Sequence, residues 1–474
     1  MIDADNPARL LARHIAGARY EDLPDEAVER TATFLLDTLG VGLAGSGGAS
    51  VEALVGTLAG WGAADDASGA ARVWVSGERL PPYTAAVLNA YQIHCMEFDC
   101  VLEEAVVHPM ATILAASLAH AERRRGRGRP VTGRELVTAL NVGVDVAAML
   151  GRAGSGPIRF FRPATCGGFG TLAALAVMEG FDEARALDGL GLMYGQTSGT
   201  LQAHAEGSQL LGLQIGFNAR AALCALDLAM AGIRGPHDVV TGPYGYLRLM
   251  EDGQFDLDCF AELGRVPQMT RMSHKPFPSG RLTHGVVHAL RELTGEHGVA
   301  PDEIVAISAH VPPLVHRLVG RPDVPSPEPN YAKLCLPFVA GAYLAHGEVG
   351  LRSFKGADRL EDEATHRHAA KVSVVLDDNP DPNALDPQRF EVTLADGRTL
   401  TLALDHVYGH PAVPLSAAEN EAKFRACAGE ARLPLAPDAV ERVIALAAEP
   451  AALDDCAVLV DALVTPGAGD ARAR

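Results

Sequence analysis

This sequence of 474 residues lacks the marks of a secreted or membrane-bound protein. Its eight cysteines are scattered, with no CxxC pair and no zinc-like doublets, which excludes a disulfide framework and favours a reduced, cytoplasmic protein. No basic stretch followed by an apolar core opens the sequence, and no run of about 18 uncharged apolar residues is present. We therefore expect neither a signal peptide nor a membrane span.

Positive charge is also scarce, because 40 lysines and arginines stand against 59 acids, a net charge of −19. A chain this acidic is not attracted to phosphate backbones or anionic lipids, so we expect no nucleic-acid partner and no membrane partner. One basic run, "ERRRGRGR" at 122–129, could be a nucleic-acid patch. We interpret it instead as a solvated helix end followed by a Gly-rich loop.

Aromatic residues make up only 5% of the chain, whereas apolar residues make up 48%, mostly Ala, Leu and Val. This composition is typical of tightly packed helices. An apolar stripe at helical spacing follows Pro24, and the Gly-rich run after it is expected to end that helix. Later segments have the same periodicity and are predicted helices: 111–124, 133–150, 168–181 and 216–233.

The glycines of "GVGLAG", at 40–45, match the G-x-G-x-x-G pattern of dinucleotide-binding proteins. That pattern binds a pyrophosphate only when a strand precedes it and a helix begins from it. Here the preceding residues have helical periodicity and no strand–helix alternation follows. A nicotinamide-dependent oxidoreductase is therefore a weak alternative.

The pattern changes near residue 266, where β-branched segments alternate with turn residues. Strands are predicted at 304–311, 371–376, 389–394 and 398–404, with helices near 283–294 and 332–346, and helices return at 414–429 and 436–448. The fold class is mainly α, with a smaller α+β lid domain inserted into a large all-α domain. The predicted boundaries are 1–267 for the first part of the all-α domain, 268–409 for the lid, and 410–474 for the returning helices.

Polar residues are concentrated in "HCMEFDCVLEEAVVHP", between two Ala-rich segments that should be buried helices. His94, Glu97, Asp99 and His108 could form a metal site, a proton-transfer site or an ordinary polar corner. A metal site needs three or four ligands at a repeatable spacing, and the sequence has no HExxH motif and no calcium-loop pattern. No metal is expected.

In "SHKPFPSGRLTH", two prolines fix the backbone around Lys275. A lysine held in this way can act as a rigid cation, or as a base if it is desolvated; a solvent-facing lysine in a rigid turn is the alternative. Other polar candidates are Arg162 in "RFFRPATCG", Gln202 and His204 in "LQAHAEGSQ", and Arg281 and His284 after the lysine. For these candidates a structural role is equally open.

Several of these strings resemble the MmgE/PrpD family, which includes 2-methylcitrate dehydratase, cis-aconitate decarboxylase and iminodisuccinate epimerase. The "H-x-x-D-F-D-D … H-P" segment of that family is similar to His94–Pro109, and its "K-P-[YF]-P" segment is similar to "HKPFPSG". The strings "GPYGY" and "HPAVPLSAAENEAKF" also resemble family signatures. The resemblance extends from about residue 10 to residue 430.

The resemblance implies a homodimer with an active site between the two domains, acting on small carboxylates without a metal or organic cofactor. It places Glu97, His108 and Lys275 in catalytic positions. We expect His108 to be the general acid or base, and Lys275 to bind carboxylate and stabilise negative charge. Glu97 is expected to orient the reacting groups or to relay a proton. The expected substrate contacts are His94, Asp99, Arg162, Gln202, His204, Arg281, His284 and Phe338.

The sequence departs from the family pattern at several positions. Glu97 is longer than the usual Asp, Cys100 replaces a second Asp, Leu211 or Gln209 stands where a lysine is usual, and Phe338 replaces a tyrosine. These changes predict a substrate other than the familiar tricarboxylate. Removal of an α-proton with loss of water, by a carbon–oxygen lyase of the 2-methylcitrate dehydratase type, is the first expectation. Epimerisation is the second and decarboxylation the third, and a non-catalytic carboxylate-binding protein is the alternative.

Overall fold

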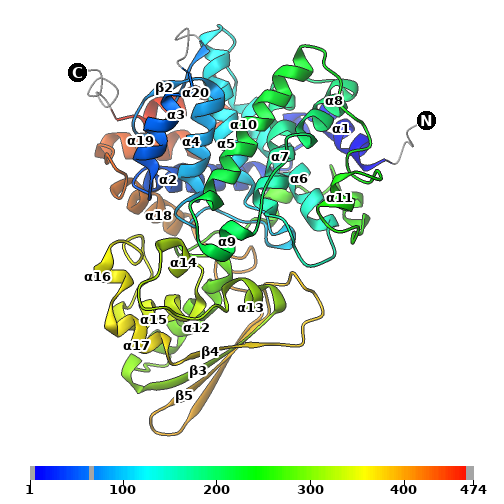
Figure 1. Cartoon of the computed structure of the whole chain (residues 1–474). Coiled ribbons are helices and arrows are strands. Elements are labelled where there is room, and N and C mark those ends of the chain that lie inside the picture. The colour runs from blue at the N-terminus through cyan, green and yellow to red at the C-terminus, as the bar shows by residue number, and fades with distance from the viewer. Residues whose placement is uncertain (1–5, 63–68, 466–474) are drawn as a thin grey trace.

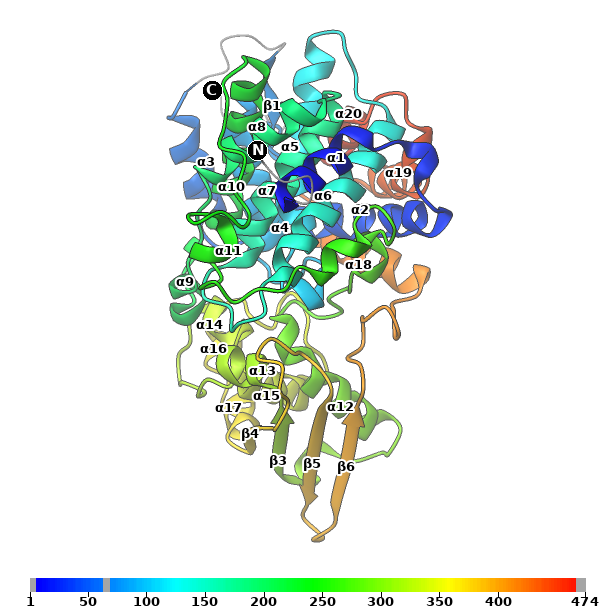
Figure 2. The same ribbon diagram turned by 90° about the vertical axis from the view of Figure 1, so that its right-hand side faces the viewer.

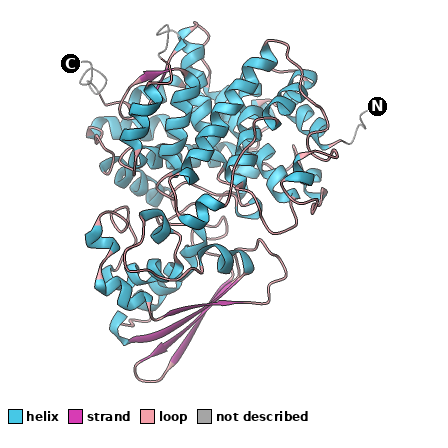
Figure 3. Ribbon diagram, in the orientation of Figure 1, coloured by secondary structure: helices cyan, strands magenta, loops and turns pink. Residues whose placement is uncertain are grey.

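The computed structural model describes residues 6–62 and 69–465, which form a large helical lobe and a smaller lobe that contains a sheet (Figure 1). Figure 3 shows that the helices dominate both lobes and that the long strands lie only in the smaller one. The mainly α fold class is therefore confirmed for these residues.

The large lobe is built from helices of the first half of the chain. They are α1 (Pro7–Gly17), α2 (Asp25–Gly45), α3 (Val51–Ala59), α4 (Pro82–His94), α5 (Pro109–Gly126), α6 (Gly133–Ala153), α7 (Arg162–Met178), α8 (Glu183–Tyr194), α9 (Gln202–Glu206), α10 (Leu210–Met230) and α11 (Tyr246–Leu249). A short antiparallel pair, β1 (Ala71–Arg72) and β2 (Arg79–Leu80), lies beside them. Local sequence signals start several of these helices: proline occupies the first turn of α4, α5 and α7, and Thr132 and Glu135 form a capping box at α6.

Small residues let these helices approach closely. Where α6 and α7 cross, a methyl group at Gly170 would lie 2.4 Å from the carbonyl oxygen of Gly143. At Gly45, in the "GVGLAG" run, it would lie 1.7 Å from the carbonyl oxygen of Gln92 in α4. The glycines of this run therefore serve helix packing, since α2 continues through them to Gly45, further than the sequence predicted.

The basic run at the end of α5 is neutralised within the protein. Arg123 pairs with Asp227 at 2.9 Å, and Arg125 pairs with Asp461 at 2.7 Å. The helix ends at Gly126, close to where the sequence predicted a helix end.

The smaller lobe contains one sheet of mixed direction, in the order β4–β3–β5–β6. Strand β3 (Ile304–Val311) is parallel to β4 (Val372–Leu376) and antiparallel to β5 (Gln388–Leu394), which forms a hairpin with β6 (Thr399–Leu404). The helices between and before the strands are α12 (His284–Gly295), α13 (Pro313–Val319), α14 (Pro329–Lys333), α15 (Leu336–His346), α16 (Ala357–Leu360) and α17 (Glu363–Ala369). The predicted strands and both predicted helical segments are confirmed.

The helices lie on one side of this sheet (Figure 2). Its core is separate from that of the large lobe and draws its buried residues from Phe277 to Leu404. The chain then returns to the large lobe through α18 (Ala417–Gly429), α19 (Pro437–Ala448) and α20 (Ala457–Leu463). Asn420 of α18, for example, donates a hydrogen bond to the carbonyl of Thr33 in α2. The exact domain boundaries, and closure of the smaller lobe as a lid, stay predictions.

One helix of the described residues, α6, is long and apolar enough to cross a membrane. Its most apolar window is 94% buried inside the protein. This is the environment of a core helix.

Candidate active site

The polar segment between α4 and α5 is a tight bend whose shape is fixed by the backbone. Glu97 and Val106 adopt left-handed conformations, each with φ of 54°. Val101 exchanges two backbone hydrogen bonds with Ser273, at 3.0 and 2.8 Å. This pairing brings the segment of Lys275, far away in the sequence, next to the bend.

Five ionisable side chains meet there in one buried cluster. The Nζ atom of Lys275 lies 2.9 Å from Oε2 of Glu97 and 3.8 Å from Oδ1 of Asp99. The other oxygen of Asp99 lies 3.0 Å from Nδ1 of His94 and 3.3 Å from Nδ1 of His108. Asp99 therefore joins both imidazoles to the ammonium group.

The contacts of each imidazole determine its protonation. His94 has a carboxylate at each ring nitrogen, since Nε2 lies 3.4 Å from Glu97. Burial opposes its charge, but Asp99 and Glu97 outweigh burial and raise the pKa of His94. The positively charged form of His94 is therefore favoured. Burial alone would raise the pKa of Asp99, but its cationic neighbours, His94 above all, lower it well below its ordinary value.

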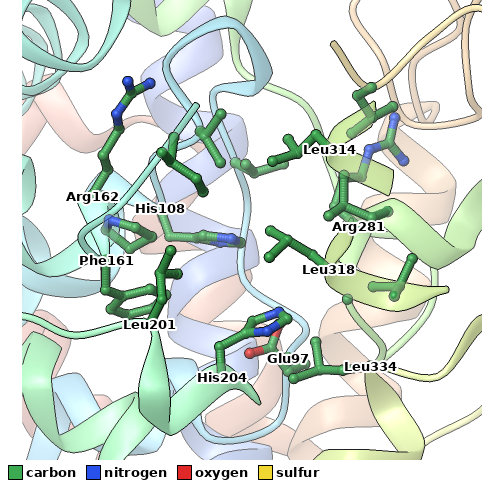
Figure 4. A pocket seen from close by; sticks show the side chains of 18 of the residues that line it. Glu97, His108, Phe161, Arg162, Leu201, His204, Arg281, Leu314, Leu318 and Leu334 are labelled. Carbon is green, nitrogen blue, oxygen red and sulfur yellow. The ribbon is translucent and has the colours of Figure 1, made fainter. Parts of the chain in front are cut away.

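His108 is in the opposite state. Its Nδ1 lies 3.1 Å from the carbonyl oxygen of Cys100, which can only accept, so Nδ1 carries the proton. Burial, with a smaller effect from Lys275, lowers the pKa of His108. The ring is neutral at pH 7, and Nε2 keeps a free lone pair. Figure 4 shows this ring directed into the cavity.

That cavity has a volume of about 690 Å³, part of it open to solvent, and lies between the two lobes. His94, Glu97 and His108 line it from the bend, and His204 lines it from α9. Residues of the smaller lobe, mostly leucines, form the facing wall. Lys275 is fully buried beneath Glu97 and does not line the cavity.

His204 offers a proton donor to the same space. Nη2 of Arg321 lies 3.2 Å from Nδ1 of His204, and a guanidinium can only donate, so Nδ1 accepts. Burial has the largest effect on the pKa of His204 and the charge of Arg321 the next largest, and together they lower it to about 4. The neutral ring must carry its proton on Nε2. The cavity therefore has a free base at His108 and a neutral donor at His204.

Two models of one protein family match this chain. The MmgE/PrpD N-terminal domain matches residues 9–258, and the MmgE/PrpD C-terminal domain matches residues 277–449. The chain belongs to the MmgE/PrpD family.

Three similar proteins are named cis-aconitate decarboxylase. The cis-aconitate decarboxylase of Homo sapiens is 29% identical over 468 residues, covering 96% of this chain and 94% of the human protein. That of Mus musculus is 28% identical over 471 residues, covering 96% and 93%. That of Aspergillus terreus is 27% identical over 288 residues, 58% of each chain.

In this MmgE/PrpD protein, Arg162 does not offer its charge to the cavity. Its Nε and Nη2 atoms bind Glu251 at 2.9 and 2.6 Å, and Nη2 also donates to the carbonyl of Gly154. Figure 4 shows the guanidinium directed away from the cavity. These contacts do not support the expectation that Arg162 binds a substrate carboxylate, because a buried carboxylate already neutralises it.

Arg281 lines the cavity but is similarly engaged. Its Nε donates to Glu103 at 2.8 Å, and its terminal nitrogens donate to the carbonyls of Tyr408 and Val407. This arginine ties the smaller lobe to the bend that contains Glu103. Its predicted role in substrate binding is not supported by these contacts.

Three further expected contacts lie outside the cavity. Gln202 is exposed and donates to Glu206 within α9. His284 is buried with Nε2 3.2 Å from the carbonyl of Ser279, and Phe338 is in the core of the smaller lobe against Phe354. The positions of Gln202, His284 and Phe338 do not support their expected role in substrate binding.

Other functional contacts were missed. Lys423 of α18 donates to the carbonyls of Lys275 and Phe98, both at 2.9 Å, and pairs with Asp37 at 2.6 Å. Lys423 therefore holds together the bend that contains Phe98 and the segment of Lys275, which between them form the ionic cluster. The signature "HPAVPLSAAENEAKF" contained Lys423, so a signal for it existed, whereas nothing in the sequence around Arg321 indicated a contact with His204.

His94, Asp99 and His108 could in principle present ligand atoms to one metal ion, since these atoms lie within 4.8 Å of one another. The Nδ1 atom of each imidazole, however, is within hydrogen-bond distance of Asp99, and the ammonium of Lys275 adjoins the same carboxylate. The geometry is that of a hydrogen-bonded ionic cluster, and a cation would have to displace these contacts.

Proposed function

We propose that this protein is a lyase that breaks a carbon–carbon bond to a carboxyl group of a small carboxylic acid, using proton transfer by its own side chains. The relatives that match nearly the whole chain are named cis-aconitate decarboxylases, which supports a lyase and favours loss of carbon dioxide. The observation that carries the proposal is the free Nε2 of His108 at the cavity, fixed by hydrogen bonds on the other side of the ring.

The proposed step needs two things from the site. Breaking the bond to the departing carboxyl group leaves an electron pair on carbon, which must be stabilised and then protonated. The Nε2–H group of His204 can donate to an oxygen on which that negative charge is delocalised. His108 can supply that proton once its Nε2 has taken one up from solvent, because an imidazole changes charge near neutral pH, and the ring becomes neutral again when it gives the proton to carbon.

The ionic cluster below the cavity holds His108 in this role. Asp99 accepts from Nδ1 of His108 and is itself fixed by His94 and Lys275. An imidazole that gains a proton at Nε2 becomes positively charged, and the carboxylate of Asp99 stabilises that charge. Asp99 is thus a positioning residue for His108.

Loss of water, which was the first expectation from the sequence, and epimerisation would use His108 in the reverse direction, to take a proton from carbon. The names of the relatives favour carbon dioxide as the product that leaves. A homodimer, implied by the family resemblance, and a cytoplasmic location, favoured by the scattered cysteines, stay predictions.

A direct test is incubation with cis-aconitate, citrate, 2-methylcitrate, malate, aspartate and iminodisuccinate in deuterated water. Release of carbon dioxide and deuterium at carbon, followed by NMR, are the readouts. His108→Gln should lower the rate by about 10²–10⁴-fold, whereas His310→Gln, on strand β3, should not change it. Binding of an acid without carbon dioxide release or label, unaffected by His108→Gln, would instead indicate a carboxylate-binding protein.

A further inference from the structure

The cavity beside His108 has one polar end and one apolar end. The polar end is formed by the bend and His204, as described above. The wall contributed by the smaller lobe is formed mostly by hydrocarbon side chains, with Arg281 at its edge toward Glu103. These side chains are Leu282, Leu314, Leu318, Val319, Leu334 and Leu385. Figure 4 shows Leu314, Leu318 and Leu334 across the cavity from His108. Apolar groups gain free energy by leaving water at such a wall, whereas a carboxylate would lose its hydration without a partner.

The cations of the cavity are already bound within the protein. The guanidinium of Arg281 is held by Glu103 and two backbone carbonyls, and that of Arg162 is held by Glu251. Lys275, buried beneath Glu97 at the polar end, is held by that carboxylate. Among the described residues that line the cavity, both arginines are therefore neutralised before any substrate arrives.

The carboxylates around the bend are paired within the protein: Glu97 with Lys275, Asp99 with His94, and Glu103 with Arg281. Arg321, which donates to His204 and to backbone carbonyls, stands outside these pairs and does not line the cavity. A molecule with three carboxylates would therefore meet the carboxylates of Glu97 and Glu103 at the cavity, with no unpaired arginine among the described residues that line it.

We propose that the substrate is an acid in which a branched hydrocarbon arm takes the place of one carboxylate-bearing arm. The reacting end lies at His108 and His204, and the hydrocarbon arm lies against the wall around Leu318. This inference rests on the proposed function, because it takes the cavity beside His108 as the reacting site. It distinguishes this chain from relatives named for a tricarboxylate.

A matched series of three probes tests the inference by calorimetric binding at pH 8. cis-Aconitate is maleate with a carboxymethyl arm, and 2-isobutylmaleate has the same number of heavy atoms in that arm without its charge. 2-Methylmaleate has the arm truncated. Each added carbon should tighten Kd about fourfold, so the isobutyl compound should bind about sixtyfold more tightly than the methyl compound. It should also bind at least about tenfold more tightly than cis-aconitate.

Variants locate the effect. Leu318→Asn should raise the Kd of 2-isobutylmaleate towards that of 2-methylmaleate. The Kd of 2-methylmaleate itself should stay within about twofold of its value for the unaltered protein. Leu376→Asn is the control, since Leu376 is an exposed leucine of β4. If Leu318→Asn does not fold, the ligand series on the unaltered protein decides alone.

The outcomes separate this inference from the proposed function. cis-Aconitate bound as tightly as 2-isobutylmaleate, equal binding of the methyl and isobutyl compounds, or no saturable binding of any probe would each overturn the inference. Carbon dioxide release from tightly bound cis-aconitate would overturn it while upholding the lyase. Tight binding of 2-isobutylmaleate, with neither carbon dioxide release nor deuterium exchange from any acid, would uphold the hydrocarbon arm and overturn the lyase.

Discussion

Replacement of Lys275 by methionine should destabilise the protein strongly at pH 8 and much less at pH 5. Methionine keeps most of the side-chain length but removes the ammonium group that lies 2.9 Å from Glu97. At that distance and an effective dielectric constant of about 20, the lost attraction is about 6 kcal/mol. Part of it is offset because the ammonium is no longer desolvated, so we expect a net loss of about 3–5 kcal/mol in the free energy of unfolding.

The pH dependence follows from the pKa of Glu97. Burial raises that pKa, but Lys275 and the two histidines outweigh burial and lower it to about 2. The unfolded carboxyl titrates near 4.5, so in the unaltered protein this group contributes about 3 kcal/mol above pH 4.5, lost as the pH falls towards 2. Without Lys275, burial dominates and Glu97 takes up a proton at higher pH, which relieves the unpaired charge.

Thermal and urea unfolding at pH 8 and pH 5 measure this effect. The double variant Lys275→Met/Glu97→Gln should recover part of the loss, because no unpaired carboxylate remains at position 97. Arg425→Met, which breaks an exposed pair with Glu441, is the control and should change the free energy of unfolding little, because solvent screens this pair. Equal destabilisation by Lys275→Met at both pH values, with no recovery in the double variant, would refute the ionic-cluster argument.

Three further predictions concern the other charged groups. Arg162→Met should lower the free energy of unfolding by about 3–5 kcal/mol, because Glu251 is left buried and unpaired; weaker substrate binding without lower stability would restore Arg162 to the substrate site. Arg321→Met should raise the pKa of His204 from about 4 and no longer fix its proton on Nε2, so kcat should fall at pH 8 and fall less at pH 5.5, where both ring nitrogens carry a proton; a pH profile like that of the unaltered protein would contradict the assigned tautomer. For His108, whose lowered pKa leaves little of the acid form at pH 8, kcat/KM should rise as the pH falls from 8 to about 6.5; a fall over this range would show that His108 acts as a base and not as the proton donor to carbon.

The features that the sequence determined are those with a local physical cause. Apolar periodicity predicted long helices such as α5, α6 and α10, and β-branched segments between turn residues predicted all four strands of the large sheet. The concentration of His94, Glu97, Asp99 and His108 in one short bend marked the ionic cluster, since groups this close in sequence must share a neighbourhood. Lys275 was found because two prolines restrict its backbone.

Tertiary structure alone decided which charges remain available at the cavity. Arg162 finds its partner at Glu251, 89 residues later, and Arg321 reaches His204, 117 residues earlier. No local pattern encodes such pairs, because an arginine looks the same in sequence whether its partner is a substrate or a buried carboxylate. The apolar wall likewise exists only because the two lobes face each other, so the character of the substrate depends on packing between segments far apart in the chain.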